Sequence, residues 1–167
     1  MYRVDLEDGT EDLAFDTGRS AMTGPGIDPT LDAVFAGSHD GNTYALDAET
    51  GEEAPRFETH WRIPNSPTIR ADRLVFGSDD RTLYAVEKRT GEAVRHVDSD
   101  GQVSSTPLVH DGAISVAERA PAPPDPEAED RDGSEIDTDG GGYKFVAADY
   151  RQPHFTCVSG RRTRTPL

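Results

Sequence analysis

The sequence has 167 residues, enough for one ordinary domain, and carries 32 acidic against 17 basic residues for a net charge of −15. This balance argues against a nucleic-acid partner, because phosphate contacts need a basic patch and the only basic cluster is Arg161-Arg162-Thr163-Arg164. No apolar run is long enough to span a bilayer, no signal peptide is recognisable, and Cys157 is the single cysteine, which excludes a disulfide framework and a cysteine-based metal site.

The basic residues are nearly all arginine, since only Lys88 and Lys144 are lysines. Acidic surfaces with so little lysine are typical of halophilic proteins, which stay hydrated in concentrated salt. Disorder also produces high charge and few aromatic residues, and we expect it only for residues 120–142. The composition therefore predicts a halophile-like source and a chain that folds only in molar salt, where repulsion between carboxylates is screened.

In chain order, the first predicted element is residues 2–10, Tyr-Arg-Val-Asp-Leu-Glu-Asp-Gly-Thr. It is a degenerate form of Tyr-Ala-Leu-Asp-Ala-Glu-Thr-Gly-Glu at 44–52, which returns 40 residues later as Tyr-Ala-Val-Glu-Lys-Arg-Thr-Gly-Glu at 84–92. A period near 40 residues, made of short strands and turns, predicts the blades of a β-propeller.

Eleven positions recur in register or form the repeated turns, and we expect them to have structural roles in the repeat. They are Gly37, Tyr44, Asp47, Thr50, Gly51, Pro67, Gly77, Tyr84, Thr90, Gly91 and Pro107. The two tyrosines could line a ligand face, but packing between blades is the expected role. Asp47 and Glu87 are expected to accept hydrogen bonds from turn amides.

Each unit is predicted to contain four short strands, which in the second unit are residues 74–77, 82–87, 93–97 and 102–109. The first is a compact apolar run, as expected of a strand buried on both faces. The third has mixed faces and should lie near the exposed rim, and Pro107 fits only at a strand end or edge. No segment shows a helical apolar period, so we expect almost no helix.

We predict propeller repeats over residues 1–119, namely a partial blade at 1–30, repeats at 31–69 and 70–109, and the start of a further blade at 110–119. An acidic, Pro- and Gly-rich disordered insertion follows at 120–142, a resumed strand at 143–150 and an atypical basic tail at 151–167. The tail is either a segment of different origin, such as a shifted reading frame, or a simple basic extension.

The predicted fold is all-β, a partial propeller of about three four-stranded antiparallel blades, two of them complete. Closed propellers need about four to eight blades, and an open array exposes unpaired strand edges. The chain is therefore expected to be a piece of a seven- or eight-bladed ring, and the alternative is that several copies assemble into one ring.

The residues Ala-x-Asp-x-x-Thr-Gly at 45–51, with a Gly-Ser strand end before them, resemble the repeat of the pyrroloquinoline-quinone-binding-like propeller family. The resemblance covers roughly residues 1–117 and 143–149 and implies a WD40- or YVTN-like architecture. In that family the fold serves quinoprotein dehydrogenases, which bind the quinone and calcium in an eight-bladed ring. It also serves non-enzymatic scaffolds and assembly factors, often outside the cytoplasmic membrane, so the resemblance favours an extracytoplasmic location.

The chain departs from the family at several positions. Pro55 and Arg95 occupy the place of the tryptophan that docks one blade on the next, and the single tryptophan, Trp61, is expected at the start of the following strand. The cysteine pair and the Glu, Asn and Asp set of the quinoprotein enzymes have no counterpart here. We therefore expect no resident cofactor and no catalysis by this chain.

Two groups of residues could suggest a metal site, and we expect neither to form one. The histidines share no metal-ligand spacing and are expected in loops. They are His39, His60, His96, His110 and His154. The segment Asp137-Thr138-Asp139-Gly140 is similar to the opening of a calcium loop, but it lacks the third acidic ligand and the bidentate glutamate.

The predicted function is a non-catalytic protein-binding or scaffolding module whose loops present the contact surface. Its partner would be another protein, or further copies joined through open blade edges. Two alternatives remain, a fragment of a quinone- and calcium-dependent dehydrogenase and a remnant without selected activity.

Overall fold

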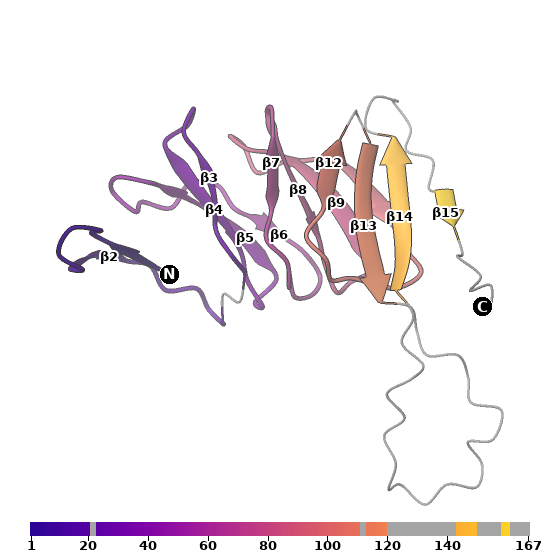
Figure 1. Cartoon of the computed structure of the whole chain (residues 1–167), viewed down its shortest axis with the longest axis horizontal. Coiled ribbons are helices and arrows are strands. Elements are labelled where there is room, and N and C mark those ends of the chain that lie inside the picture. The colour runs from indigo at the N-terminus through magenta and orange to yellow at the C-terminus, as the bar shows by residue number, and fades with distance from the viewer. Residues whose placement is uncertain (21–22, 111–112, 120–142, 150–157, 161–167) are drawn as a thin grey trace, which may run out of the picture.

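A computed structural model describes residues 1–20, 23–110, 113–119, 143–149 and 158–160, and in these ranges it contains strands and no helix (Figure 1). The strands are β1 (Tyr2–Val4), β2 (Glu11–Ala14), β3 (Gly26–Asp28), β4 (Ala33–Gly37), β5 (Asn42–Asp47), β6 (Phe57–Glu58), β7 (Thr68–Arg70), β8 (Arg73–Gly77), β9 (Thr82–Glu87), β10 (Ala93–Asp98), β11 (Gln102–Val103), β12 (Leu108–His110), β13 (Ala113–Arg119), β14 (Tyr143–Asp149) and β15 (Val158–Gly160). The insertion expected at 120–142 with its Asp137–Gly140 motif, His154, Cys157 and most of the basic tail lie outside the described residues.

The strands form a row of antiparallel sheets that follow one another in chain order (Figure 1). A two-stranded hairpin, β1-β2, stands at the N-terminal end. Two four-stranded sheets follow, ordered β3-β4-β5-β6 and β7-β8-β9-β10, and β11 to β15 form the last sheet. This arrangement confirms the all-β, partial-propeller prediction.

The sheets do not begin where the sequence units begin. Residues 102–109 were expected to close the sheet that contains β9, but β11 and β12 pair with β13 of the next sheet, so this expectation is wrong. The reason is local: β7 and β8 are joined by the two residues Ala71 and Asp72, with Ala71 in the left-handed region at φ 49°. The short hairpin joins the end of one sequence unit to the start of the next.

The last sheet is four strands wide, because β11 and β12 both pair with β13, at different parts of its length. It is more complete than the sequence indicates. β14 pairs with β13 along its whole length, as expected for a resumed strand. β15 then pairs with β14 and lies within the segment predicted as an atypical tail. Its three residues contain no strand signal strong enough to separate it from a loop.

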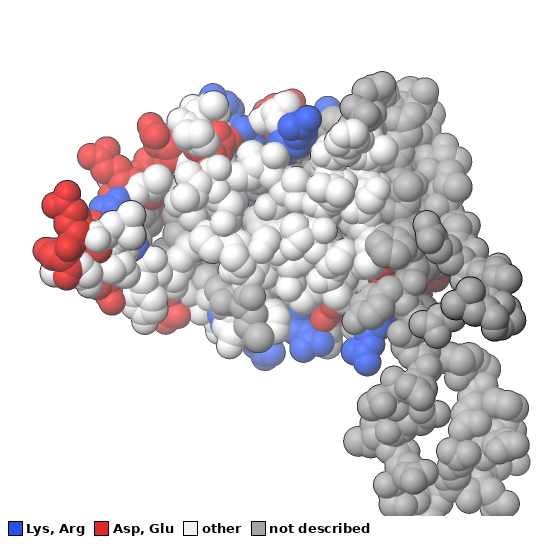
Figure 2. Space-filling model, viewed as in Figure 1, with Lys and Arg blue, Asp and Glu red and all other residues white. Residues whose placement is uncertain are grey.

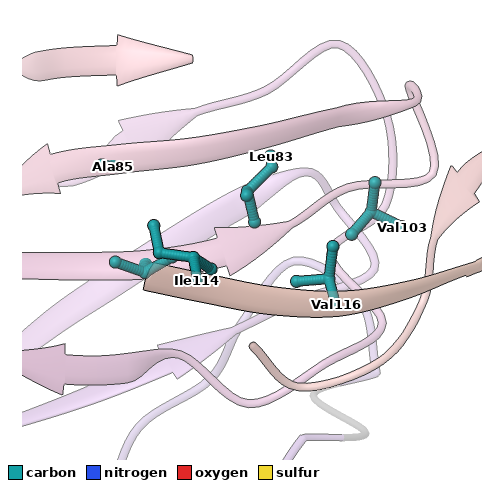
Figure 3. Close-up of a cluster of buried hydrophobic side chains, with 6 residues drawn as sticks. Leu83, Ala85, Val103, Ile114 and Val116 are labelled. Carbon is teal, nitrogen blue, oxygen red and sulfur yellow. The ribbon is translucent and has the colours of Figure 1, made fainter. Parts of the chain in front are cut away.

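The core consists of two apolar clusters, each of them between neighbouring sheets. One joins the sheet of β4 to that of β8 and contains Phe35, Ala45, Ile63, Leu74, Phe76 and Val86. The other joins the sheet of β8 to that of β13 and contains Val75, Leu83, Ala85, Val103, Ile114 and Val116 (Figure 3). The central strands are therefore buried on both faces, as their continuous apolar runs predict.

Two of the buried side chains lie just beyond a sheet along the chain, Ile63 in the linker between β6 and β7 and Val103 in the short strand β11. Ile63 and Val103 are fully buried, and each packs against a glycine that ends a central strand. A methyl group on Gly37 would lie 2.6 Å from Ile63 Cγ2, and one on Gly77 would lie 2.5 Å from the Val103 carbonyl oxygen. The repeated glycines are therefore required by the close approach of the following linker.

Aromatic side chains connect each outer strand to the next sheet. Phe15, which follows β2, meets Tyr44 edge-on at 5.3 Å between ring centroids. Phe57 of β6 meets Tyr84 of β9 at 5.2 Å. The same contact thus recurs at two successive sheet interfaces, and it gives the tyrosines the packing role expected of them.

A buried ion pair links two sheets and does not recur in the next repeat. Lys88 Nζ, just after β9, donates to Asp28 Oδ2 in β3, and both side chains are under 10 % exposed. Thr30 donates to the other carboxylate oxygen through its amide and its hydroxyl. The hydrogen bonds from Lys88 and Thr30 lower the pKa of Asp28 to about 2.

Replacing Gly77 with alanine should destabilise the protein, because the new methyl group would overlap Val103. We expect the Gly77→Ala variant to lose about 1–3 kcal/mol of unfolding free energy, the usual cost of an overpacked core. The measurement is urea-induced unfolding at fixed salt. Gly24→Ala is the matched control, since its methyl group would meet only the Ser66 hydroxyl at 3.3 Å, and equal losses in both variants would contradict the packing argument.

The stabilisation from Asp28 should depend on pH in a defined direction. Because its folded pKa is lowered from 3.8 to about 2, its contribution is present above pH 4 and is lost as the pH falls toward 2. The difference in unfolding free energy between wild type and Asp28→Asn should shrink over that window, and a constant difference would contradict this assignment.

At neutral pH, Lys88→Met should lower the unfolding free energy by about 3–5 kcal/mol, since it leaves a buried carboxylate unpaired.

Candidate interaction surface on the linker face

One end of the sheets carries both the central hairpins and the linkers to the next sheet. Because the strands alternate in direction, the β4–β5 and β8–β9 hairpins (38–41 and 78–81) emerge beside the linkers 15–20, 59–67 and 99–101. We call this end the linker face. The turns at 5–10, 47–53 and 87–93 lie at the opposite end.

The two hairpins on the linker face have the same internal hydrogen bonds. Ser38 N donates to the Asn42 carbonyl, and Ser78 N donates to the Thr82 carbonyl, each at 3.0 Å. Tyr44 Oη donates to Asp40 Oδ2 at 2.7 Å and Tyr84 Oη to Asp80 Oδ2 at 2.9 Å. Burial and the hydrogen bond to Asp80 raise the pKa of Tyr84 to about 12, so this hydroxyl remains a donor.

The hairpins in turn hold the backbone of the linkers. Ile63 N donates to the Ser38 carbonyl at 3.0 Å, and Val103 N donates to the Ser78 carbonyl at 3.2 Å. In the opposite direction, Asp79 N donates to the Arg62 carbonyl at 2.9 Å. The linker backbone is therefore fixed on both sides by contacts that the repeat supplies.

The side chains that this backbone presents do not repeat. Arg19 and Trp61 occupy matching places, because the hydroxyl two residues before each, on Thr17 or Thr59, donates to its carbonyl at 2.5 Å or 2.6 Å. Trp61 is 58 % exposed although it is the single tryptophan of the chain. An exposed tryptophan on a fixed backbone is a feature that the repeat does not require.

A pocket of about 510 Å³ opens at this position on the linker face. It is lined by Arg19, His39, Asp40, His60, Trp61 and Arg62. Its residues come from the linker that follows β2, the β4–β5 hairpin and the linker between β6 and β7. Two histidines expected in loops, His39 and His60, do lie here, whereas His96 and His110 lie in strands.

The carboxylates in and around the pocket are already engaged by the protein. Asp40 Oδ1 accepts hydrogen bonds from the amide and side chain of Asn42, and its other oxygen accepts one from Tyr44. Burial alone would raise the pKa of Asp40, but these bonds hold it below the ordinary value. Asp79, 7 % exposed, pairs with Arg62 Nη2 at 3.0 Å. The hydrogen-bonding capacity left to a ligand is mostly that of donors.

Charge is unevenly distributed over the molecule (Figure 2). Acidic side chains are densest at the end formed by the hairpin β1-β2, and most of the visible Lys and Arg side chains lie along the upper and lower edges, where further acidic side chains stand among them. Within the described ranges, no three side chains of His, Cys, Asp or Glu are grouped as metal ligands. Those ranges also contain no helix that could cross a membrane.

The other repeat residues lie away from this pocket and have structural contacts. Asp47 Oδ1 accepts hydrogen bonds from the amides of Glu49 and Thr50, as its sequence position indicates. Glu87 differs, because it accepts only from the Thr90 hydroxyl, at 3.2 Å. Its longer side chain does not replace the short aspartate that bonds the turn amides.

The prolines and turn glycines are the remaining repeat residues, and they also have structural roles. Pro67 and Pro107 are buried and lie immediately before β7 and β12, where no ladder amide is lost. Gly51 and Gly91 end the turns at the opposite face with φ near 70°, as the Thr-Gly motif predicts.

The comparisons with known proteins agree with this geometry. The family model described as outer membrane protein assembly factor BamB, a model of PQQ-like repeats, matches residues 2–120 and again 39–162. The chain belongs to the BamB family. This confirms the resemblance drawn from the repeated Asp-x-x-Thr-Gly turn.

Solved structures show the same fold at low sequence identity. BamB from Moraxella catarrhalis superposes with a TM-score of 0.58 at 16% identity, over 88% of this chain and 55% of that one. The β-propeller domain of Cps50 (Swd1) from Myceliophteria thermophila gives 0.63 at 15% identity, over 87% of this chain and 40% of that one. The chain thus spans about half the length of these propellers. Among curated proteins, no relative matches the chain.

This BamB-family chain docks its sheets without the tryptophan expected four residues after the turn glycine. A methyl group on Gly51 would lie 2.9 Å from Leu13 Cγ, and one on Gly91 would lie 3.3 Å from the Pro55 carbonyl oxygen. Leu13 therefore packs on the turn glycine Gly51, the backbone of Pro55 and Arg56 lies against Gly91, and Phe57 adds the aromatic contact with Tyr84.

The sequence did not single out the pocket residues. Trp61 was expected at the start of a strand, but it lies between β6 and β7, so that expectation is wrong. The preceding linker is fixed by Thr59, whose hydroxyl bonds the Gly41 and Trp61 carbonyls, and this ends the strand before Trp61. The sequence contains one weak signal for these positions, since Thr17 and Thr59 match while Arg19 and Trp61, two residues after each, differ.

Proposed function

We propose that the chain is a non-catalytic, protein-binding propeller module that contacts its partner through the linker face. The observation that supports this is Trp61, 58 % exposed and flanked by Arg19 and Arg62 on a backbone fixed by the repeat. Tryptophan and arginine are enriched among the residues that dominate binding energy at protein interfaces. Tryptophan exposed on a rigid backbone also loses little conformational freedom on binding.

Family membership supports the same proposal. The family model is named for an assembly factor, and one structural neighbour is itself BamB. The proposal carries over only the general role of a propeller that binds other proteins. A scaffolding role would follow if one partner is bound at the linker face while a second binds elsewhere.

The test is affinity capture of partners from the source cells with three forms of the full chain. Wild type and the opposite-face variant Arg89→Ala should retain the same protein, whereas Trp61→Ala should bind it at least about tenfold more weakly, as expected for a residue central to an interface. Arg89 lies in the exposed turn after β9 and serves as the matched control. Equal binding by all three forms would contradict the proposal, as would saturable binding of pyrroloquinoline quinone with calcium.

A further inference from the structure

The pocket on the linker face has an excess of hydrogen-bond donors over available acceptors. Within the described residues, no carboxylate pairs with the Arg19 guanidinium, and Arg62 uses only Nη2 for Asp79. An arginine side chain carries five N–H donors and no acceptor. Asp40, the carboxylate that lines the pocket, already accepts from Asn42 and Tyr44.

We propose that this pocket binds a carboxylate of the partner protein, held by Arg19 and Arg62, while an adjoining apolar side chain of the partner packs on the Trp61 indole. The inference rests on the proposed function and adds to it the chemistry of the bound segment. Arginine donors match the two oxygens of a carboxylate, and such charge-assisted hydrogen bonds are among the stronger ones in proteins.

The electrostatics of the whole chain favour a single carboxylate over a polyanion. A net charge of −15 repels nucleic acid, which needs a basic patch far larger than two arginines. The pocket volume of about 510 Å³ fits one or two side chains. Asp79, which is buried beneath Arg62, fixes one edge of that guanidinium and leaves its other donors available.

The lone tryptophan makes the pocket directly observable, because emission excited where tyrosine does not absorb comes from Trp61 alone. The full chain is titrated, at the lowest KCl concentration that keeps its far-UV spectrum native, with three peptides. These are acetylated and amidated Gly-Pro-Leu-Glu-Glu, its Gly-Pro-Leu-Gln-Gln twin, and that twin with a free C-terminal carboxylate. The first and third peptides report side-chain and terminal carboxylates separately.

We expect at least one carboxylate peptide to shift the Trp61 emission saturably and to bind about tenfold more tightly than the amidated glutamine twin. Arg19→Gln should remove most of this preference without affecting folding, since Arg19 is exposed and its side chain makes no hydrogen bond or ion pair among the described residues. Arg62→Gln should act in the same direction, and Arg89→Gln, on the opposite face, should leave the affinities unchanged.

Equal affinities for the carboxylate peptides and the glutamine twin would overturn the inference, as would no binding by any peptide or an Arg19→Gln variant that keeps the full preference. The outcome is separable from that of the proposed function. If Trp61→Ala loses the captured protein but the peptides show no carboxylate preference, only the carboxylate assignment fails. If Trp61→Ala retains the captured protein, the linker face itself is not the interface.

Discussion

The sheets of β4, β8 and β13 are joined by apolar side chains that follow one sheet along the chain and pack onto the backbone of its strand-ending glycine. Ile63 on Gly37 and Val103 on Gly77 are two copies of this contact, and both side chains are fully buried. The backbone amides of the same two residues donate hydrogen bonds to the Ser38 and Ser78 carbonyls. Because a closed ring is not needed for these contacts, a row of sheets can form through nearest-neighbour interfaces alone.

The contacts that hold the linkers against the hairpins also determine which side chains are available for function. The backbone of residues 59–63 is held by hydrogen bonds to the hairpins of two sheets, so the side chains at Trp61 and Arg62 project from a rigid support. Interface residues that are held in place before binding lose less entropy when a partner arrives. The repeat thus supplies stability, and the positions that break it supply the candidate contact surface.

Much of the architecture could be predicted from the sequence, because the repeat reports the same contacts several times. Gly77, Tyr84 and the Thr-Gly turn at Gly91 recur since each makes a contact that is repeated at two successive sheet interfaces. The sheet boundaries could not be predicted, because the β7–β8 hairpin turns at Ala71 and Asp72 without glycine or proline. The pocket could not be predicted either, since Arg19 and Trp61 are brought together only when neighbouring linkers align on one face.

Amide hydrogen exchange tests most directly whether the hairpins and linkers are held together as firmly as the sheets themselves. The amides of Ile63 and Asp79 lie outside the paired strand residues but donate to carbonyls between a hairpin and a linker, Ser38 and Arg62. They should exchange as slowly as the amides of Val75 and Ala85 in the central strands, which open only with the sheets. Exchange as fast as that of Glu49 and Thr50 in the exposed turn would contradict the account, since the linkers would then be ordinary mobile loops.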